Sequence, residues 1–172
     1  MQHGLVQLYT GNGKGKTTAA LGLAMRAVGA GLKVYLGQFI KKGSFSEIKA
    51  LRRFHPDIIV RQYGRGCFVR GKPAAADIRA ARQGLKDLQE ALTSRKYDLV
   101  IGDEIICALN AELISMEDIM KLIVKKPSSV ELVLTGRNAP KKIINKTDLV
   151  TEMRKVRHPF DKGLSARKGI EY

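Results

Sequence analysis

The feature that most constrains this chain is the stretch YTGNGKGKTTAALGLA, residues 9–24. It resembles a phosphate-binding loop, whose usual pattern is G-x-x-x-x-G-K-[ST]. Thr10 replaces the first glycine of that pattern, and glycines stand at positions 11, 13 and 15. An apolar strand-like segment (5–9) precedes the loop, and a helix is predicted over 16–30. A glycine-rich turn that merely precedes a helix is the alternative, but the order strand–loop–helix is the one that phosphate binding requires.

The residues of this loop have distinct predicted roles. Successive backbone N–H groups at a helix start form a site for anions, so the loop is expected to surround a polyphosphate. Lys16 is expected to neutralise phosphate oxygens, and the Thr17 hydroxyl to coordinate Mg2+. The predicted nucleotide-binding residues are Gly11, Asn12, Gly13, Lys14, Gly15, Lys16, Thr17 and Thr18.

A second motif, YDLVIGDE, is an apolar strand predicted over 98–104 that ends in two carboxylates, Asp103 and Glu104. Acids end many strands, so the motif alone is weak. Together with a phosphate-binding loop it predicts that one or both carboxylates serve the magnesium ion, directly or through water. The pair of motifs favours a nucleotide bound with Mg2+.

The rest of the chain alternates strands and helices. Further strands are predicted over 33–39, 58–63, 130–136 and 148–156, and a long amphipathic helix over 75–94. Ser44 with Glu47 predicts a capping box for a short helix that ends near residue 53. Ser115 with Asp118 predicts another helix, which Pro127 stops, and Pro140 fits the first turn of one more. This pattern predicts one α/β domain over 1–172, a RecA-like P-loop NTPase with a mostly parallel sheet of about six strands flanked by helices.

Charge is the unusual part of the composition, at +15 overall. Residues 41–72, the basic segment, hold nine Lys or Arg and two acids, hence +7. Such a surface favours an anionic partner, although a solvated basic face is the alternative. No apolar run approaches the ~18 residues of a membrane span. Two cysteines make no disulfide framework, so a cytoplasmic location is expected, and Cys67 is interpreted as a packing or incidental residue.

No residue marks a base for an acceptor hydroxyl, because the three histidines are scattered and none has metal-ligand spacing. A small-molecule kinase would need such a base. A RecA-like ATPase that depends on nucleic acid shares the loop and the charge, but 6% aromatics without a stacking cluster argue against it. A non-enzymatic nucleotide-binding regulator is a further alternative.

Five ordered segments carry a family resemblance. They are TGNGKGKTT, VYLGQFIKKG, YDLVIGDEI, VELVLTGRNAP and the ending TDLVTEMRKVRHPFDKGLSARKGIEY. Together they resemble the P-loop type of ATP:corrinoid adenosyltransferase, the cob(I)yrinic acid a,c-diamide adenosyltransferase family, from about residue 5 to the end. Members of that family have the same loop start, including the threonine at the position of Thr10.

The resemblance implies transfer of the 5′-deoxyadenosyl group of ATP to cobalt(I) of a corrinoid, with triphosphate released intact. It also implies a nucleotide reversed in the loop, with its terminal phosphate deepest. Cobalt(I) brings its own electron pair, so no protein base is needed. The leaving triphosphate would be stabilised by Lys16, by the loop amides and by Mg2+ held through Thr17, Asp103 and Glu104. The predicted catalytic residues are Lys16 and Glu104.

The resemblance further implies a corrinoid site and partners. Phe68 lies in the loop that, in this family, packs against the lower face of the corrinoid. Family members have a Phe and a Trp in that loop, whereas this chain has no tryptophan. A core Phe is the alternative for Phe68. Arg26, Arg137 and Asn138 are the other predicted corrinoid contacts; for Arg26 a solvent-exposed arginine is the alternative, and Arg137 and Asn138 follow the end of a predicted strand, where ligands bind in open α/β sheets. The expected partners are a reduced flavin or flavodoxin-like electron donor and a second copy in a homodimer, with neither nucleic acid nor membrane.

Overall fold

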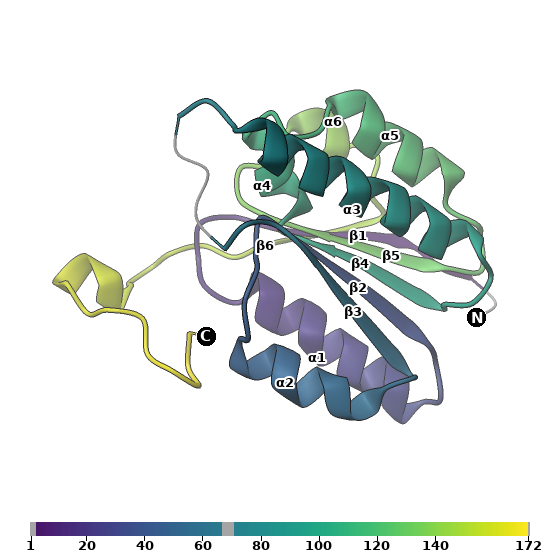
Figure 1. Ribbon diagram of the computed structural model, residues 1–172, viewed down its shortest axis with the longest axis horizontal. Coiled ribbons are helices and arrows are strands. Elements are labelled where there is room, and N and C mark those ends of the chain that lie inside the picture. Colours follow the sequence, from purple (N-terminus) through teal and green to yellow (C-terminus); the bar gives the residue numbers. More distant parts are fainter. Residues whose placement is uncertain (1–2, 67–70, 172) are drawn as a thin grey trace.

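A computed structural model describes residues 3–66 and 71–171. Its centre is a six-stranded sheet with the strand order β3-β2-β4-β5-β1-β6 (Figure 1). All five strand pairs are parallel, so the predicted α/β class with a parallel sheet of six strands is confirmed. The strands are β1 (Val6–Thr10), β2 (Val34–Phe39), β3 (Ile58–Tyr63), β4 (Leu99–Asp103), β5 (Glu131–Thr135) and β6 (Leu149–Glu152).

Helices cover both faces of the sheet (Figure 1). One face carries α1 (Lys16–Gly29) and α2 (Ser46–Leu51), and the other carries α3 (Ala75–Thr93), α4 (Ile105–Asn110), α5 (Met116–Lys125) and α6 (Lys141–Ile144). Short 3-10 turns follow at Arg52–Phe54 and Pro159–Lys162. Within the described residues, no helix combines the length and the apolar character needed to cross a bilayer.

The strands divide their side chains between two apolar cores. Val34 and Leu36 of β2 pack in the cluster beneath α1, whereas Tyr35 and Phe39 belong to the cluster beneath α3. This alternation explains why the strands are almost continuously apolar, because both faces of a parallel sheet are buried. On α1 the buried face is made of alanines spaced four and three residues apart, which lets the helix approach the sheet closely.

Three sequence predictions of local structure need correction, and one helix was missed. The Ser44–Glu47 capping box is wrong: α2 begins at Ser46, its N-cap is Phe45, and no side chain caps it. Pro140 is the N-cap of α6, one residue before the first turn. The last strand ends at Glu152, well before the predicted residue 156. Helix α4, which starts directly after Glu104, was not predicted.

The Ser115–Asp118 capping box is confirmed, with both reciprocal bonds present. The same side-chain pattern therefore caps one helix and not the other. Ser44 lies two residues before the first helical residue, too early to be the N-cap. The position of the serine relative to the first helical residue therefore distinguishes the two helices.

Candidate functional site

The parallel strands bring their carboxyl ends to one edge of the sheet, where ligands bind in open α/β proteins. The loop after β1, the turn after β2 and the ends of β4 and β5 meet there. A cavity of about 580 Å3 opens at this edge. Residues 13–18 and Leu21, Lys41, Ser46, Glu47, Ala50, Glu104, Arg137, His158 and residues 169–171 line it.

The glycines of the phosphate-binding loop are fixed by contact with the chain after β6. A Cβ on Gly13 would lie 2.7 Å from the Met153 carbonyl oxygen, and one on Gly11 only 2.5 Å from it. Gly11 and Gly15 also have φ of 91° and 125°, which favour glycine. The Gly13 N–H donates to the Met153 carbonyl, so this amide points at the protein and not at the cavity. The loop glycines therefore serve packing as well as the predicted anion site.

Thr10 stands where the usual loop has its first glycine. It is buried at the end of β1, and its hydroxyl accepts a hydrogen bond of 3.2 Å from the Ala139 N–H. The Thr10 carbonyl accepts from the Met153 N–H at 2.9 Å. Thr10 thus ties the start of the loop to the segment after β5 and to the residue after β6, and the first of these bonds needs a hydroxyl that glycine lacks.

Lys16 starts α1 and is only 6% exposed. Its ammonium donates to the carbonyls of Gly11 at 2.7 Å and Gly13 at 2.8 Å, so it lies within the loop. Burial lowers the pKa of Lys16, and the positive charge of Arg137 lowers it further, while the carboxylates of Glu104 and Asp103 oppose the shift. Positive groups thus converge at one end of the cavity, as an anion site requires.

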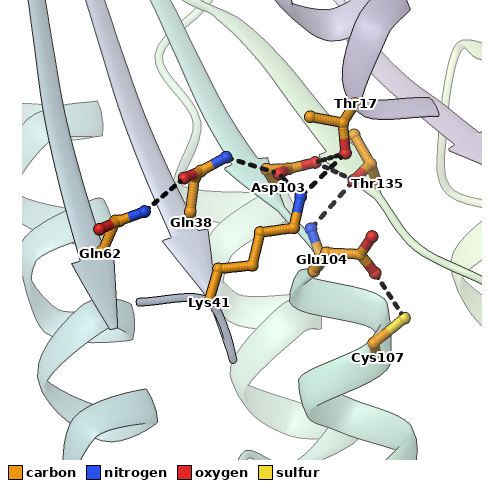
Figure 2. Close-up of polar contacts among 8 residues, drawn as sticks. All are labelled: Thr17, Gln38, Lys41, Gln62, Asp103, Glu104, Cys107 and Thr135. Carbon is orange, nitrogen blue, oxygen red and sulfur yellow. Dashed lines mark hydrogen bonds and ion pairs between the residues drawn. The ribbon is translucent and has the colours of Figure 1, made fainter. Parts of the chain in front are cut away.

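Asp103 is the hub of the polar network at the end of β4 (Figure 2). Its carboxylate is fully buried and accepts from the Thr17 and Thr135 hydroxyls, each at 2.8 Å. Gln38 donates to its other oxygen at 3.1 Å. The predicted association of Thr17 with the acid-ended strand is therefore direct, through a hydrogen bond that spans the start of α1 and the end of β4.

Lys41 also contacts this hub. Its ammonium lies 2.9 Å from Asp103 Oδ2 and 3.2 Å from the Thr17 hydroxyl oxygen. Burial alone would lower the pKa of Lys41, but the charge of Asp103 and their hydrogen bond raise it overall. Sequence reasoning counted Lys41 as part of the basic segment. Lys41 follows the carboxyl end of β2, and Gln38 and Thr135 lie at the carboxyl ends of β2 and β5. These positions were the signal that could have placed all three residues at the site.

Glu104 takes a different direction from Asp103 (Figure 2). Its backbone is left-handed, with φ of 58°, and its N–H donates to the Thr135 hydroxyl at 2.9 Å. The carboxylate accepts from the Cys107 thiol at 2.7 Å while still lining the cavity. Burial raises the pKa of that thiol to about 12, aided by the charge of Glu104. Only Asp103 of the predicted pair contacts Thr17.

Lys14 points away from the loop interior. Its ammonium contacts the carboxylate of Glu171 at 2.9 Å and the carbonyl of Ile170 at 3.0 Å. Arg167 also donates to the Glu171 carboxylate. The hydrogen bonds from Arg167, and to a lesser extent from Lys14, lower the pKa of Glu171 to about 2. The chain end (169–171) thus returns to the loop and forms a wall of the cavity.

The structure separates the predicted corrinoid residues. Arg137 lines the cavity, and Asn138 follows it in the left-handed region with φ of 53°, both exposed. Arg26 is exposed in the last turn of α1, about 15 Å along the helix from Lys16. Phe68 and Cys67 lie outside the described residues. No cluster of three or more His, Cys, Asp or Glu that could hold a metal occurs in the part of the chain that the structure describes.

The donor set at the hub fits a hard cation. Thr17 and Asp103 supply oxygen atoms, the ligand type that Mg2+ takes, and Glu104 adds a carboxylate beside them. Mg2+ in nucleotide sites is bound by one or two protein oxygens together with phosphates, so a cluster of three acidic ligands is not required.

Known proteins resemble this chain over nearly its whole length. A family model described as ATP:corrinoid adenosyltransferase BtuR/CobO/CobP matches residues 2–172. A corrinoid adenosyltransferase of Pseudomonas aeruginosa is 34% identical over 99% of this chain and 85% of its own length. Proteins of the same name are 32% identical in Sinorhizobium, with 99% and 81% covered, and in Escherichia coli K12, with 99% and 87% covered.

Proposed function

The chain belongs to the ATP:corrinoid adenosyltransferase family, whose members transfer an adenosyl group from ATP to a corrinoid, and we propose how its own residues carry out that transfer. The transferred group is the 5′-deoxyadenosyl group, the acceptor is cobalt(I), and triphosphate leaves intact. The product is adenosylcobalamin or adenosylcobyrinic acid diamide, in coenzyme B12 synthesis or salvage.

The observation that carries the proposal is that Lys16 and Thr17 line the cavity while the buried Asp103 carboxylate accepts a hydrogen bond from Thr17. A buried ammonium and the start of a 14-residue helix provide positive charge to a polyanion. The cavity extends from Lys16 past Arg137 to the chain end, which leaves room for the rest of the nucleotide. Because Lys16 is a buried cation of the cavity wall, we place the terminal phosphate there and the ribose toward the cavity mouth.

The protein's tasks in this reaction are positioning and stabilisation of charge. The reaction forms a cobalt–carbon bond with the electron pair of cobalt(I) and breaks the bond from C5′ to the triphosphate oxygen, whose electron pair leaves with the triphosphate. Lys16 and Arg137 stabilise this developing charge, since donors fixed in advance lower the barrier without reorganising. Thr17, Asp103 and Glu104 would hold Mg2+, which supplies further positive charge to the leaving group when bound.

Further assignments complete the proposal. Arg26, Phe68, Arg137 and Asn138 are proposed corrinoid contacts, of which Arg137 has support from its place on the cavity. A reduced flavin or a flavodoxin-like protein is the proposed source of electrons, and the charge of the basic segment suits an acidic donor. We also propose a homodimer that works in the cytoplasm.

The test is an anaerobic incubation of the full chain with ATP, Mg2+ and chemically reduced cob(I)alamin. The corrinoid spectrum and the phosphates released are followed together. Adenosylcobalamin with an equal amount of intact triphosphate is expected. ATP cleaved only to ADP and phosphate, with the corrinoid unchanged, would contradict the proposal.

A further inference from the structure

The Asp103 carboxylate has its full complement of hydrogen bonds. Thr17 and Thr135 donate to Oδ1, and Gln38 and Lys41 donate to Oδ2. A carboxylate offers about four lone-pair sites, so all of them are used. A divalent cation can therefore bind Asp103 directly only if one of these four donors leaves.

Lys41, which also donates to the Thr17 hydroxyl at 3.2 Å, is the donor that can leave. Gln38 and Thr135 are fully buried on strands β2 and β5 and have second bonds, to Gln62 Nε2 and the Glu104 N–H respectively. The Lys41 side chain is 26% exposed, lines the cavity and ends in a flexible four-carbon stem. Its ammonium can move into the cavity without disturbing a strand.

The backbone before Lys41 is strained in a way that aims this side chain. Ile40 has φ of 62°, which is an outlier for a β-branched residue. A Cβ on Gly64 would lie 2.3 Å from the Ile40 carbonyl carbon, so the glycine admits the close approach of this turn. Directly after β2 the Lys41 N–H donates to the Phe39 carbonyl in a tight turn, and the Lys41 side chain extends toward Asp103 (Figure 2). Strain of this kind persists only where the surrounding structure holds the backbone in place, and such residues cluster at ligand-binding and active sites.

We propose that the Lys41 ammonium occupies the magnesium position beside Asp103 and Thr17 until the triphosphate chain of ATP binds. Lys41 is then exchanged for the metal ion. Lys41 repels a divalent cation that comes alone, because two positive charges cannot share the same oxygens. A cation that comes with triphosphate brings compensating negative charge, and the Lys41 ammonium then moves from Asp103 to a phosphate oxygen. Lys41 would thus contact the leaving group and make metal binding conditional on nucleotide. The inference rests on the proposed nucleotide–metal site.

The test measures binding of Mn2+, as a spectroscopic substitute for Mg2+, by electron paramagnetic resonance with and without tripolyphosphate. Lys41→Met removes the charge and keeps the length of the side chain. We expect it to bind Mn2+ alone at least about tenfold more tightly than the wild type does. We also expect tripolyphosphate to strengthen Mn2+ binding less in the variant. Lys42→Met is the matched control, because it removes the same charge from an exposed neighbour.

The outcomes separate this inference from the proposed function. Equal affinities for Mn2+ alone in Lys41→Met and Lys42→Met would overturn the inference while leaving the metal site intact. Absence of Mn2+ binding to the wild type even with tripolyphosphate would overturn the metal site and the inference together. Adding Asp103→Asn to Lys41→Met should remove the gained affinity, and persistence of the gain would also refute the proposal. Lys41→Gln, which keeps an N–H donor and removes the charge, gives the same comparison if Lys41→Met does not fold.

Discussion

The Thr17 hydroxyl, at the start of α1, donates a 2.8 Å hydrogen bond to the buried carboxylate of Asp103, at the end of β4. The two residues are 86 positions apart in the chain, and β5 lies between β4 and β1, the strand that leads into the loop before Thr17. This bond links the phosphate-binding loop to the acid-ended strand. It fixes the direction of the threonine oxygen that the proposed Mg2+ site uses.

Thr17→Val should therefore raise the Mg2+ concentration needed for half-maximal adenosyl transfer by about tenfold or more, the scale of lost metal-ligand support. The valine keeps the shape of the side chain and removes the oxygen. Thr17→Ser keeps the oxygen and should stay close to the wild type. A magnesium titration of the rate with cob(I)alamin checks both variants. Identical titration curves for Thr17→Val and the wild type would refute the metal role of Thr17.

Lys16→Ala should lower turnover by at least ~100-fold, as loss of one fixed charge-stabilising donor does. Lys14→Ala is the informative comparison, because Lys14 lies two positions away and pairs with Glu171 at the surface. We expect Lys14→Ala to act mainly on the KM for ATP and to change turnover less than ~10-fold. The measurement is steady-state kinetics with chemically reduced corrinoid. Near-normal turnover of Lys16→Ala would contradict its catalytic assignment.

The Cys107 thiol should be nearly inert to iodoacetamide at pH 8. Burial, with the Glu104 charge, raises its pKa to about 12, so only about one molecule in ten thousand is thiolate at that pH. The alkylation rate should rise with pH through 8 to 10 without levelling off, since the thiolate forms only near pH 12. The experiment uses a Cys67→Ser background and mass spectrometry.

In the same background, Glu104→Gln should lower the pKa of Cys107 and speed alkylation by roughly tenfold, because a neutral amide no longer opposes the thiolate. Burial remains, so the pKa should stay above the ordinary value. A plateau near pH 9 in the parent protein would contradict the raised pKa.

Gly13→Ala should destabilise the protein by ~1–3 kcal/mol, because the new Cβ would lie 2.7–2.9 Å from backbone atoms of Met153 and Arg154. Gly22→Ala is the matched change within α1, where nothing lies within 4 Å of the new Cβ. It should stabilise by ~0.5–1 kcal/mol, as alanine does in an exposed helix. Urea unfolding measures both free energies. Equal effects of the two substitutions would show that contact with the chain after β6 does not restrict the loop.

Ser115→Ala should cost about 1 kcal/mol of unfolding free energy, since it removes a capping box with both bonds present. Ser44→Ala should change stability by less than ~0.5 kcal/mol, because Ser44 caps no helix. Thermal and urea unfolding of the two variants provide the check. A loss for Ser44→Ala as large as for Ser115→Ala would place the start of α2 earlier than Ser46.

The sequence by itself determined what depends on neighbours along the chain. The loop after an apolar strand, the acid-ended strand, the Ser115 capping box and the alternation of strands with helices all follow from local periodicity and residue type. They predicted the α/β class, the parallel sheet, and Lys16, Thr17 and Asp103 as parts of one site. The five ordered motifs also identified the family.

Only the tertiary structure decided which distant groups meet. Gln38, Lys41 and Thr135 converge on Asp103 because the order of parallel strands places the ends of β2, β4 and β5 together, and strand order is not written in local periodicity. Glu104 turns to Cys107, and Lys14 turns to the chain end, because each charge takes the partner that folding brings within hydrogen-bond distance. A side chain's type therefore set which contacts were chemically allowed, and the packing of the sheet selected the one that forms.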